Sequence, residues 1–560
     1  MSLKKALIFS LAIILLFSLA LPVFAEGGED AVSFGFWSLM PPLIAIILAF
    51  VTKQVILSLF LGIFVGATMM NGGNIFFGFL RTLDGYILGS AADSWNAAIL
   101  IFTLTIGGMI GVISKMGGTH AIAEALSKKA KTARSAQLVT WAMGCLVFFD
   151  DYANTLIVGP TMRPLTDKMK ISREKLSYVV DSTAAPVAGM AVISTWVGYE
   201  LGLINDAMTS LGIEVNAYGI FLRSIPYRFY DIFAIVMVFL VAYMLRDFGP
   251  MYVAEKRARL TGKVLADGAN PMASTDMERE IPEGTTLKVS NAVIPILTLV
   301  VVSFVGLWYS GGGTELPGTM EGIRTAFGDA DASVALIWGS ATASIVAIIL
   351  SISQKIMSIG EAFDAWVDGA KSLVITAIIL ILAWSIGSVA GDVGTANYLI
   401  GIVTETLPPF MLPLLVFAIS CVVAFATGTS WGTMAIMMPL AIPLAAAFNG
   451  NVVDSLMLST LSAVLTGSIF GDHCSPISDT TIMSSMASAA DHIDHVKTQF
   501  PYAVFVAFVA IAVGYLPAGL GMNPFISLVV GVALIWAVLK FYGKSTKEED
   551  LKALEESKVA

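Results

Sequence analysis

Apolar segments about as long as a membrane bilayer is thick recur along the whole chain. Only 13% of the residues are charged, compared with ~25% in soluble domains. A chain inside lipid must satisfy its backbone hydrogen bonds internally, so these segments predict an all-α polytopic membrane protein. The candidate spans are 36–51, 55–70, 95–115, 176–203, 229–246, 289–309, 332–351, 372–392, 455–486, 500–517 and 525–542.

Two further apolar stretches, 137–165 and 410–447, have centres rich in polar residues, glycine and proline. Each is predicted to be a re-entrant hairpin that enters and leaves the membrane on one side. Non-helical backbone at membrane depth is tolerated where protein buries it or water reaches it. The hairpins are therefore candidate places for polar chemistry.

The first 25 residues resemble a signal peptide. Lys4-Lys5 precede an apolar run from Ala6 to Leu21, and Val23-Phe24-Ala25 resembles a small-residue cleavage site. We expect cleavage after Ala25. The apolar run is slightly long for a signal peptide, so an uncleaved first helix is the alternative.

The distribution of Lys and Arg orients the predicted spans. If Glu26 lies outside, the basic clusters at 128–134, 168–175 and 256–259 all face the cytoplasm, as the positive-inside rule requires. The four residues that fall outside are Arg81, Arg223, Arg228 and Arg324, so no basic residue is expected in the membrane interior. In this topology 247–288 is a cytoplasmic linker, 525–542 is an extra C-terminal transmembrane helix and 543–560 is a cytoplasmic tail.

The segments on either side of the linker, 36–246 and 289–518, are predicted to be transmembrane repeats at an offset of about 280 residues. Their matched segments are Leu104–Gly111 with Trp384–Gly391, Asp150–Asn154 with Thr429–Thr433, and Asp181–Pro186 with Gly471–Pro476. The span at 55–70 runs outward in this topology, and its partner at 332–351 runs inward. The repeats are therefore inverted, as in many secondary transporters.

Each half carries two polar breaks, one in its hairpin and one in the following helix. Pro186 and Pro476 remove amide donors and should unwind the helices that contain them. The adjacent carboxylates Asp150 and Asp151 lose hydration and repel each other in an apolar setting, so such a pair is expected only where something binds.

Carboxylates, hydroxyls and freed carbonyls are hard oxygen ligands, which suit Na⁺. The candidate Na⁺ ligands are Asp150, Asp151, Asp472 and Asp479. The full set of candidate substrate- or ion-binding residues is Asp150, Asp151, Asn154, Thr155, Asp181, Ser182, Thr183, Thr427, Thr429, Ser430, Thr433, Asp472, His473, Ser475, Ser478, Asp479 and Thr480.

Several of these hydroxyls are expected to bond only to carbonyls of their own helix. His473 is either a proton carrier or an oriented hydrogen-bond donor. The segment Asp491–His495 has a metal-like composition, but it lies at a predicted cytoplasmic helix start. A solvated polar turn is the expected structure there.

Three segments, Phe148–Asn154, Asp181–Pro186 and Gly471–Thr481, resemble signature segments of the NhaC family of sodium/proton antiporters. The resemblance extends from about residue 36 to 518. It implies a bacterial inner-membrane carrier of the wider ion-transporter fold, with paired hairpins and broken helices. It leaves the substrate open, because similar family members exchange malate and lactate with Na⁺ and H⁺, or carry amino acids.

The leading hypothesis is exchange of Na⁺ for H⁺ by alternating access, with Asp150, Asp151 and Asp472 alternating between Na⁺ and protons. The alternative is Na⁺-coupled transport of a small organic acid or amino acid, which the expected lack of an intramembrane cation disfavours. A passive channel fits less well, because the breaks predict discrete occluded sites. The expected partners are the lipid bilayer, Na⁺ and H⁺. No enzymatic activity, resident cofactor or nucleic-acid partner is expected.

Overall fold

The structure is a computed structural model, which describes residues 34–559 apart from 53, 128–130, 214–215, 272–284, 320–321, 324, 327–329, 396, 399–406 and 477. The predicted signal peptide lies outside the described residues. The helices before the linker are α2 (Met40–Thr52), α3 (Val55–Met70), α4 (Ile75–Arg81), α5 (Leu88–Ala92), α6 (Ser94–Lys115), α7 (Gly118–Ser127), α8 (Ala133–Leu146), α9 (Asp151–Lys168), α10 (Arg173–Ser182), α11 (Ala185–Met190), α12 (Thr195–Ser210), α13 (Ala217–Ser224) and α14 (Phe229–Met244).

The linker region contains one more helix, and the second half repeats the pattern of long and broken helices. These helices are α15 (Gly249–Thr261), α16 (Ser290–Ser310), α18 (Ala332–Ser353), α19 (Ile359–Lys371), α20 (Val374–Asp392), α22 (Leu412–Thr427), α23 (Ser430–Asn449), α24 (Ser455–Cys474), α25 (Asp479–Ala487), α26 (His492–Val509), α27 (Leu516–Gly519), α28 (Pro524–Phe541) and α29 (Glu548–Val559). Short 3₁₀ or π segments are η2 (Gly35–Leu39), η3 (Thr82–Ile87), η4 (Ile225–Tyr227), η5 (Pro409–Met411) and η6 (Ala510–Tyr515).

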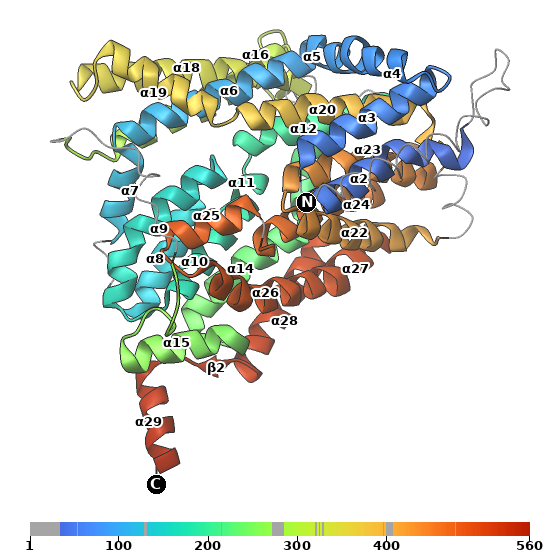
Figure 1. The fold of residues 1–560 in the computed structure, drawn as a ribbon. Helices are drawn as coiled ribbons and strands as arrows, with labels where there is room; N and C mark the ends of the chain where they lie inside the picture. The colour runs from blue at the N-terminus through green and yellow to red at the C-terminus, as the bar shows by residue number, and fades with distance from the viewer. Residues whose placement is uncertain are drawn as a thin grey trace.

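Seven of the described helical segments are long and apolar enough to cross a membrane, and two bent pairs bring the number to nine. One bent pair joins α10–α11 to α12 at 48°, and the other joins α13–η4 to α14 at 50°. The prediction of an all-α polytopic membrane protein is therefore confirmed. Figure 1 shows α6, α16, α18 and α19 along one edge of the molecule and α15, α28 and α29 towards the opposite end.

The order of elements recurs in the two halves. In each half a helical hairpin, α8–α9 or α22–α23, precedes a broken helix, α10–α11 or α24–α25. The second hairpin has longer legs than a re-entrant hairpin requires. Its apolar segments of 19 and 20 residues are each long enough to cross a membrane, whereas α8 has only 14 residues.

Small residues let helices of the two halves approach closely. A Cβ atom added at Gly111 on α6 would lie 2.2 Å from the carbonyl oxygen of Ala365 on α19, and one added at Gly369 on α19 would lie 2.2 Å from the carbonyl oxygen of Gly107. The spacing of Gly107 and Gly111 is the small-xxx-small pattern of tightly packed membrane helices. Van der Waals contact at this seam therefore holds α6 against α19.

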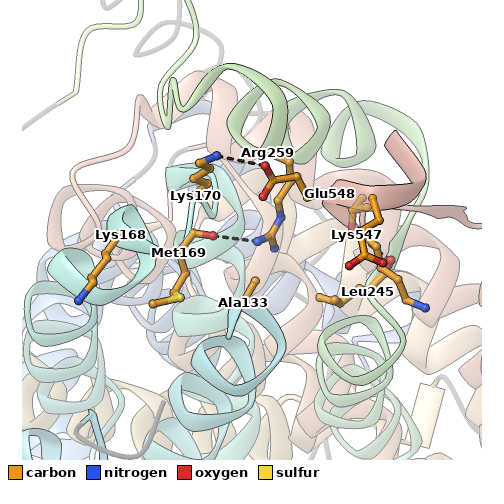
Figure 2. Close-up of a pocket in the computed structure, with 10 residues that line it drawn as sticks. Ala133, Lys168, Met169, Lys170, Leu245, Arg259, Lys547 and Glu548 are labelled. Carbon is orange, nitrogen blue, oxygen red and sulfur yellow. Dashed lines mark hydrogen bonds and ion pairs between the residues drawn. The ribbon is translucent and has the colours of Figure 1, made fainter. Parts of the chain in front are cut away.

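The C-terminal segment packs on the linker and on the end of α9. Strand β2 (Lys544–Ser545) pairs antiparallel with β1 (Arg246–Asp247). A cleft of about 360 Å³ lies beside this contact and is lined by residues of α9, α15 and α29 (Figure 2). Across it Lys170 Nζ lies 3.2 Å from Glu548 Oε1. None of the predicted site residues lines this cleft.

Candidate ion-binding site

The break between α24 and α25 places Asp472 among hydroxyl groups. Ser430, at the start of α23, donates to Asp472 Oδ2 at 3.0 Å, and Ser478 donates to Asp472 Oδ1 at 2.6 Å. The side chains of Thr480 and Thr481 donate to the Asp472 backbone carbonyl at 3.3 and 2.8 Å. Asp472 is buried, with 1% of its surface exposed. The second hairpin and the second broken helix therefore meet at one carboxylate.

Two glycines make this meeting possible. Gly428 ends α22 with φ 72°, a left-handed conformation that favours glycine, and lets the chain turn into α23. A Cβ atom at Gly471 would lie 2.2 Å from the backbone nitrogen of Phe425. Larger residues at position 471 would push α24 away from the hairpin and separate Asp472 from Ser430.

In the first half the hairpin tip contacts both the broken helix and the start of α12. Thr195 donates its hydroxyl to Asp150 Oδ2 at 3.1 Å. The Asn154 amide donates to the carbonyls of Gly144, Val147 and Thr183 at 2.6, 3.1 and 2.9 Å. The amide of Asn154 thus holds the tip of its own hairpin against the end of α10.

Aromatic side chains connect the two hairpin tips. Trp196 follows Thr195, Trp431 follows Ser430, and their rings lie 4.8 Å apart. The Tyr199 ring packs edge-on against Trp431 at 4.4 Å, and its hydroxyl donates to the Trp431 carbonyl. Tertiary packing therefore brings the partners of Asp150 and Asp472, Thr195 and Ser430, next to residues of one buried aromatic group.

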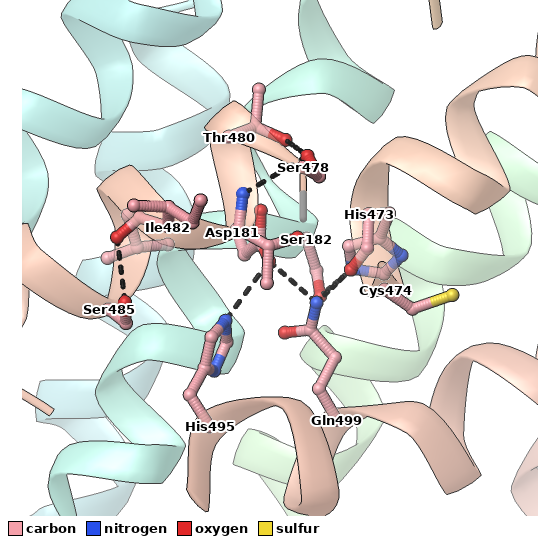
Figure 3. A network of polar contacts seen from close by, with 12 residues as sticks. Asp181, Ser182, His473, Cys474, Ser478, Thr480, Ile482, Ser485, His495 and Gln499 are labelled. Atoms are coloured by element: carbon pink, nitrogen blue, oxygen red, sulfur yellow. Dashed lines mark hydrogen bonds and ion pairs between the residues drawn. The ribbon is translucent and has the colours of Figure 1, made fainter. Parts of the chain in front are cut away.

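A second polar network surrounds Asp181, the carboxylate at the end of α10 (Figure 3). His495 Nε2 lies 3.1 Å from Asp181 Oδ2, and Gln499 Nε2 donates to the same oxygen at 2.6 Å. Gln499 also donates to the backbone carbonyl of His473. All of the polar partners in this network are buried.

The His473 ring lies between the two halves. Its Nε2 is 2.6 Å from the Ser182 hydroxyl, and its Nδ1 is 2.7 Å from the Tyr230 hydroxyl. His473 therefore connects α10 and α14 to the second broken helix. Its ring partners are hydroxyl groups and not the neighbouring Asp472.

The remaining predicted residues occupy less informative positions. Asp151 is buried in the first turn of α9, and Thr429 is the residue before α23. The Asp479 side chain lies outside the described parts of the structure. Four hydroxyls donate to carbonyls of their own helix, as expected for some of the set; they belong to Thr155, Thr183, Thr427 and Thr433. The Ser475 hydroxyl instead donates to the carbonyl of Phe425 on α22.

The prediction of a solvated turn at Asp491–His495 holds for the first four residues, which are exposed or partly exposed, but not for His495. The segment does begin α26, but His495 is fully buried against Asp181, and His492 Nε2 lies 2.8 Å from the Pro476 carbonyl. These histidines, together with Thr195, Tyr230, Thr481 and Gln499, belong to the polar networks and were missed. The only available signal was the spacing of His492, His495 and Gln499, which places them near one face of a helix.

One of the basic residues expected on the outer side is buried inside the protein. Arg228 lies at the bend between η4 and α14 and is fully buried against Glu200 on α12. The positive-inside rule predicts which side of the membrane a loop faces. It does not predict that a residue at a bend turns inward to an acidic partner, as Arg228 does.

The described residues hold no group of three or more His, Cys, Asp or Glu side chains arranged to bind a metal ion. The site instead offers single carboxylates with hydroxyl groups, inside broken helices of a multi-pass membrane protein. Broken helices with polar groups at their breaks are typical of secondary transporters. The chain belongs to the Na⁺/H⁺ antiporter family, whose family model matches residues 31–191 and 187–520.

Two known proteins have sequences similar to this chain. An uncharacterized protein of Haemophilus influenzae is 35% identical over 513 residues, covering 90% of this chain and 95% of the relative. The arginine/ornithine antiporter ArcD of Halobacterium salinarum is 30% identical over 186 residues, covering 32% of this chain and 36% of that protein. The predicted resemblance to sodium/proton antiporters is confirmed by the family match.

A solved structure shares the fold. The YdaH transporter of Alcanivorax borkumensis aligns with a TM-score of 0.52 at 12% sequence identity, covering 82% of this chain and 89% of that chain. At this identity the likeness concerns the fold alone. It supports the same helical fold for the chain.

Proposed function

We propose that the protein exchanges Na⁺ for H⁺ across the bacterial inner membrane by alternating access. The observation that carries the proposal is the Asp472 carboxylate, which is buried at a helix break and held by the hydroxyls of Ser430 and Ser478. A hydroxyl has one hydrogen to donate and two lone pairs. The same side chains can therefore donate to an empty carboxylate or turn their oxygens towards Na⁺.

Competition between Na⁺ and H⁺ follows from the cost of a buried charge. When Na⁺ leaves, a charged Asp472 in a dehydrated site is destabilised unless a proton neutralises it. Asp150 and Asp151 are the second carboxylate position, with Thr195 already bonded to Asp150. Because one carboxylate cannot hold both ions fully, binding of Na⁺ releases a proton, and this is the exchange step.

We infer that the contact between the two hairpin tips controls from which side the site is accessible. The Trp196–Trp431 and Tyr199–Trp431 contacts join the neighbours of the residues that bond Asp150 and Asp472. Each position lies beside a hairpin of its own half. Movement of one hairpin would then open the site to one side, while the aromatic group keeps it closed to the other.

Proteoliposomes containing the full-length protein test the proposal. An inward Na⁺ gradient is expected to drive proton efflux without any organic solute, and a pH gradient is expected to drive accumulation of radioactive Na⁺. Asp472→Asn should lower both fluxes strongly at Na⁺ concentrations near the wild-type KM, and Asp368→Asn, which changes an exposed carboxylate on α19, should leave them unchanged. Proton movement that is independent of Na⁺ in the wild type would refute the proposal.

A second candidate function is Na⁺-coupled transport of a small organic acid or amino acid. The match to an arginine/ornithine antiporter favours it, as does the start of α23 at Ser430, where free backbone amides could bind a carboxylate. Arg228 does not favour it, because its guanidinium fork is already paired with Glu200. Stimulation of Na⁺ flux by malate, lactate, arginine or ornithine, and its loss in Ser430→Ala, would make this the better assignment.

A further inference from the structure

Asp231, in the first turn of α14, is a fully buried carboxyl group outside the network of Asp150, Asp181 and Asp472. Among the described residues, no hydrogen-bond partner lies within reach of either of its oxygens. A buried carboxylate with no donor is strongly disfavoured relative to the neutral acid. The Asp231 carboxyl group is therefore stable only when a proton is bound to it or a cation moves next to it.

The nearest cation, Arg228, is already engaged. Its Nη1 lies 3.1 Å from Glu200 Oε1 and its Nη2 lies 2.5 Å from Glu200 Oε2. Nη1 also donates to the Gly189 carbonyl, while Nε has no partner among the described residues. All three charged side chains, Glu200, Arg228 and Asp231, are fully buried. One guanidinium balances one carboxylate, so a second buried carboxylate leaves the group with an excess negative charge.

The other groups near Asp231 are uncharged. The guanidinium carbon of Arg228 lies 4.9 Å from the centre of the Phe221 ring. The titratable groups facing Asp231 are Glu200 on α12, Arg228 before α14, Tyr230 beside it on α14, and Tyr515 on η6. Tyr515 is bonded to Thr466 and to the Ser462 carbonyl. None of these groups supplies a second positive charge.

We propose that Asp231 is a second proton-binding residue of the transporter, separate from the Na⁺ site, and that Arg228 shifts towards Asp231 and is shared between Glu200 and Asp231 when the proton leaves. The proton travels between Asp231 and water, so the step is a simple ionisation. The free Nε of Arg228 is the donor available to the new carboxylate. This inference rests on the proposed exchange of Na⁺ for H⁺.

Two contacts couple this proton to the Na⁺ site. Glu200 and Thr195 lie on the same helix, α12, and Thr195 bonds to Asp150. Tyr230 precedes Asp231 and contacts the His473 ring. When Arg228 shifts towards Asp231, its bonds to Glu200 and to the Gly189 carbonyl weaken. The contact between α11 and α12 then loosens, and both Thr195 and Tyr230 can shift. Loss of the proton at Asp231 thereby changes the site at Asp150 and His473.

Infrared difference spectroscopy of the purified protein tests the proton directly. Between acidic and alkaline pH, the wild type is expected to show carbonyl bands of protonated carboxyl groups. Asp231→Asn should lack one component of these bands, and the exposed-site control Asp368→Asn should keep every component. Glu200→Gln should also weaken the Asp231 component at neutral pH, because Arg228 is then free to pair with Asp231. Unchanged bands in Asp231→Asn would overturn the proposal, whatever the transport activity.

Transport in proteoliposomes tests the coupling. Asp231→Asn, which keeps the site neutral, is expected to retain Na⁺/Na⁺ exchange within about twofold but to lose at least about tenfold of the Na⁺-driven proton flux. A parallel fall of both fluxes would identify a purely structural residue and overturn the proposal, as would wild-type values of both. A wild type that shows the infrared band but no Na⁺-driven proton flux would refute the proposed function and leave the proton site standing.

Discussion

The two broken helices, α10–α11 and α24–α25, hold their carboxylates with different kinds of donor. Asp181 in the first half is bonded to nitrogen atoms of His495 and Gln499. Asp472 in the second half is bonded to hydroxyls of Ser430 and Ser478. The N–H groups of a side-chain amide can only donate, whereas a hydroxyl can also accept or coordinate a cation.

This difference assigns separate tasks to two similar breaks. The donors on Asp181 satisfy its charge and hold α10 against α26, so the first break acts as a fixed support. The donors on Asp472 leave oxygen lone pairs available, so the second break is suited to bind and release a cation. We infer that the repeat in sequence does not produce two equivalent ion sites. Each of the following predictions tests this contrast.

The first prediction has an all-or-none outcome and tests whether the two halves are inverted relative to each other in the membrane. Lys168 and Asn451 are exposed and follow equivalent legs of the two hairpins, α9 and α23. In a variant without native cysteines, a cysteine at Lys168 is expected to react with a membrane-impermeant reagent only from the cytoplasm. A cysteine at Asn451 should react only from outside. Reaction of both from the same side would rule out inverted halves.

The largest effect on activity is expected at Asp472. Asp472→Asn removes the charged ligand and should raise the apparent KM for Na⁺ by roughly 100-fold, about 2.7 kcal/mol of lost ion binding. Asp181→Asn should raise it by less than about fivefold, because this carboxylate faces nitrogen donors. Initial rates of Na⁺ uptake across a concentration series measure both values. Equal losses in the two variants would contradict the division of tasks.

Substitution of the hydrogen-bond donors should show that those on Asp181 contribute mainly to stability and those on Asp472 mainly to Na⁺ affinity. Gln499→Leu leaves the buried Asp181 oxygen and the His473 carbonyl without this donor, and should lower the free energy of unfolding by about 1–3 kcal/mol with little change in KM. Ser430→Ala should raise the apparent KM for Na⁺ several-fold, with a smaller loss of stability. Thermal unfolding in detergent and Na⁺ uptake are measured on both variants. The reverse pattern would indicate that the first break binds Na⁺ and the second is the fixed support.

The smallest effect concerns the tail, which contacts the end of the first hairpin. Hydrogen bonds from Lys552 and then Lys170 hold the pKa of Glu548 below its ordinary value of 4.5. This contact is therefore fully stabilising above that value and is lost as the pH falls through the lower pKa of the folded state. Both side chains of the Lys170–Glu548 pair are more than a third exposed, so its contribution is below about 1 kcal/mol.

Hydrogen exchange of the tail amides measures this contribution. Protection of residues 546–559 should weaken at acidic pH in the wild type and be weaker at neutral pH in Glu548→Gln. Peptides from α23 in the second hairpin should not change in this variant. Equal protection of the tail in the two proteins at neutral pH would show that the Lys170–Glu548 contact does not hold it.

The sequence alone determined the membrane class, the positions of the breaks and the order of hairpin and broken helix. Hydropathy decides where a helix can lie in lipid, and Pro186, Pro476 and Gly428 act on the backbone within one helical turn. These effects are local and can be read from a few neighbouring residues. For that reason the predicted breaks coincide with the ends of α10, α22 and α24.

The tertiary structure decided which groups meet at each break. Asp181 pairs with His495, 314 residues further along the chain, and Arg228 turns inward to Glu200. No local pattern indicates such partners, because they come from separate spans whose packing depends on the whole bundle. A buried charge must find a partner wherever packing places one. The sequence therefore identified Asp181 and Asp472 as carboxylates at the breaks. Only the fold showed that Asp181 faces nitrogen donors and Asp472 faces hydroxyls.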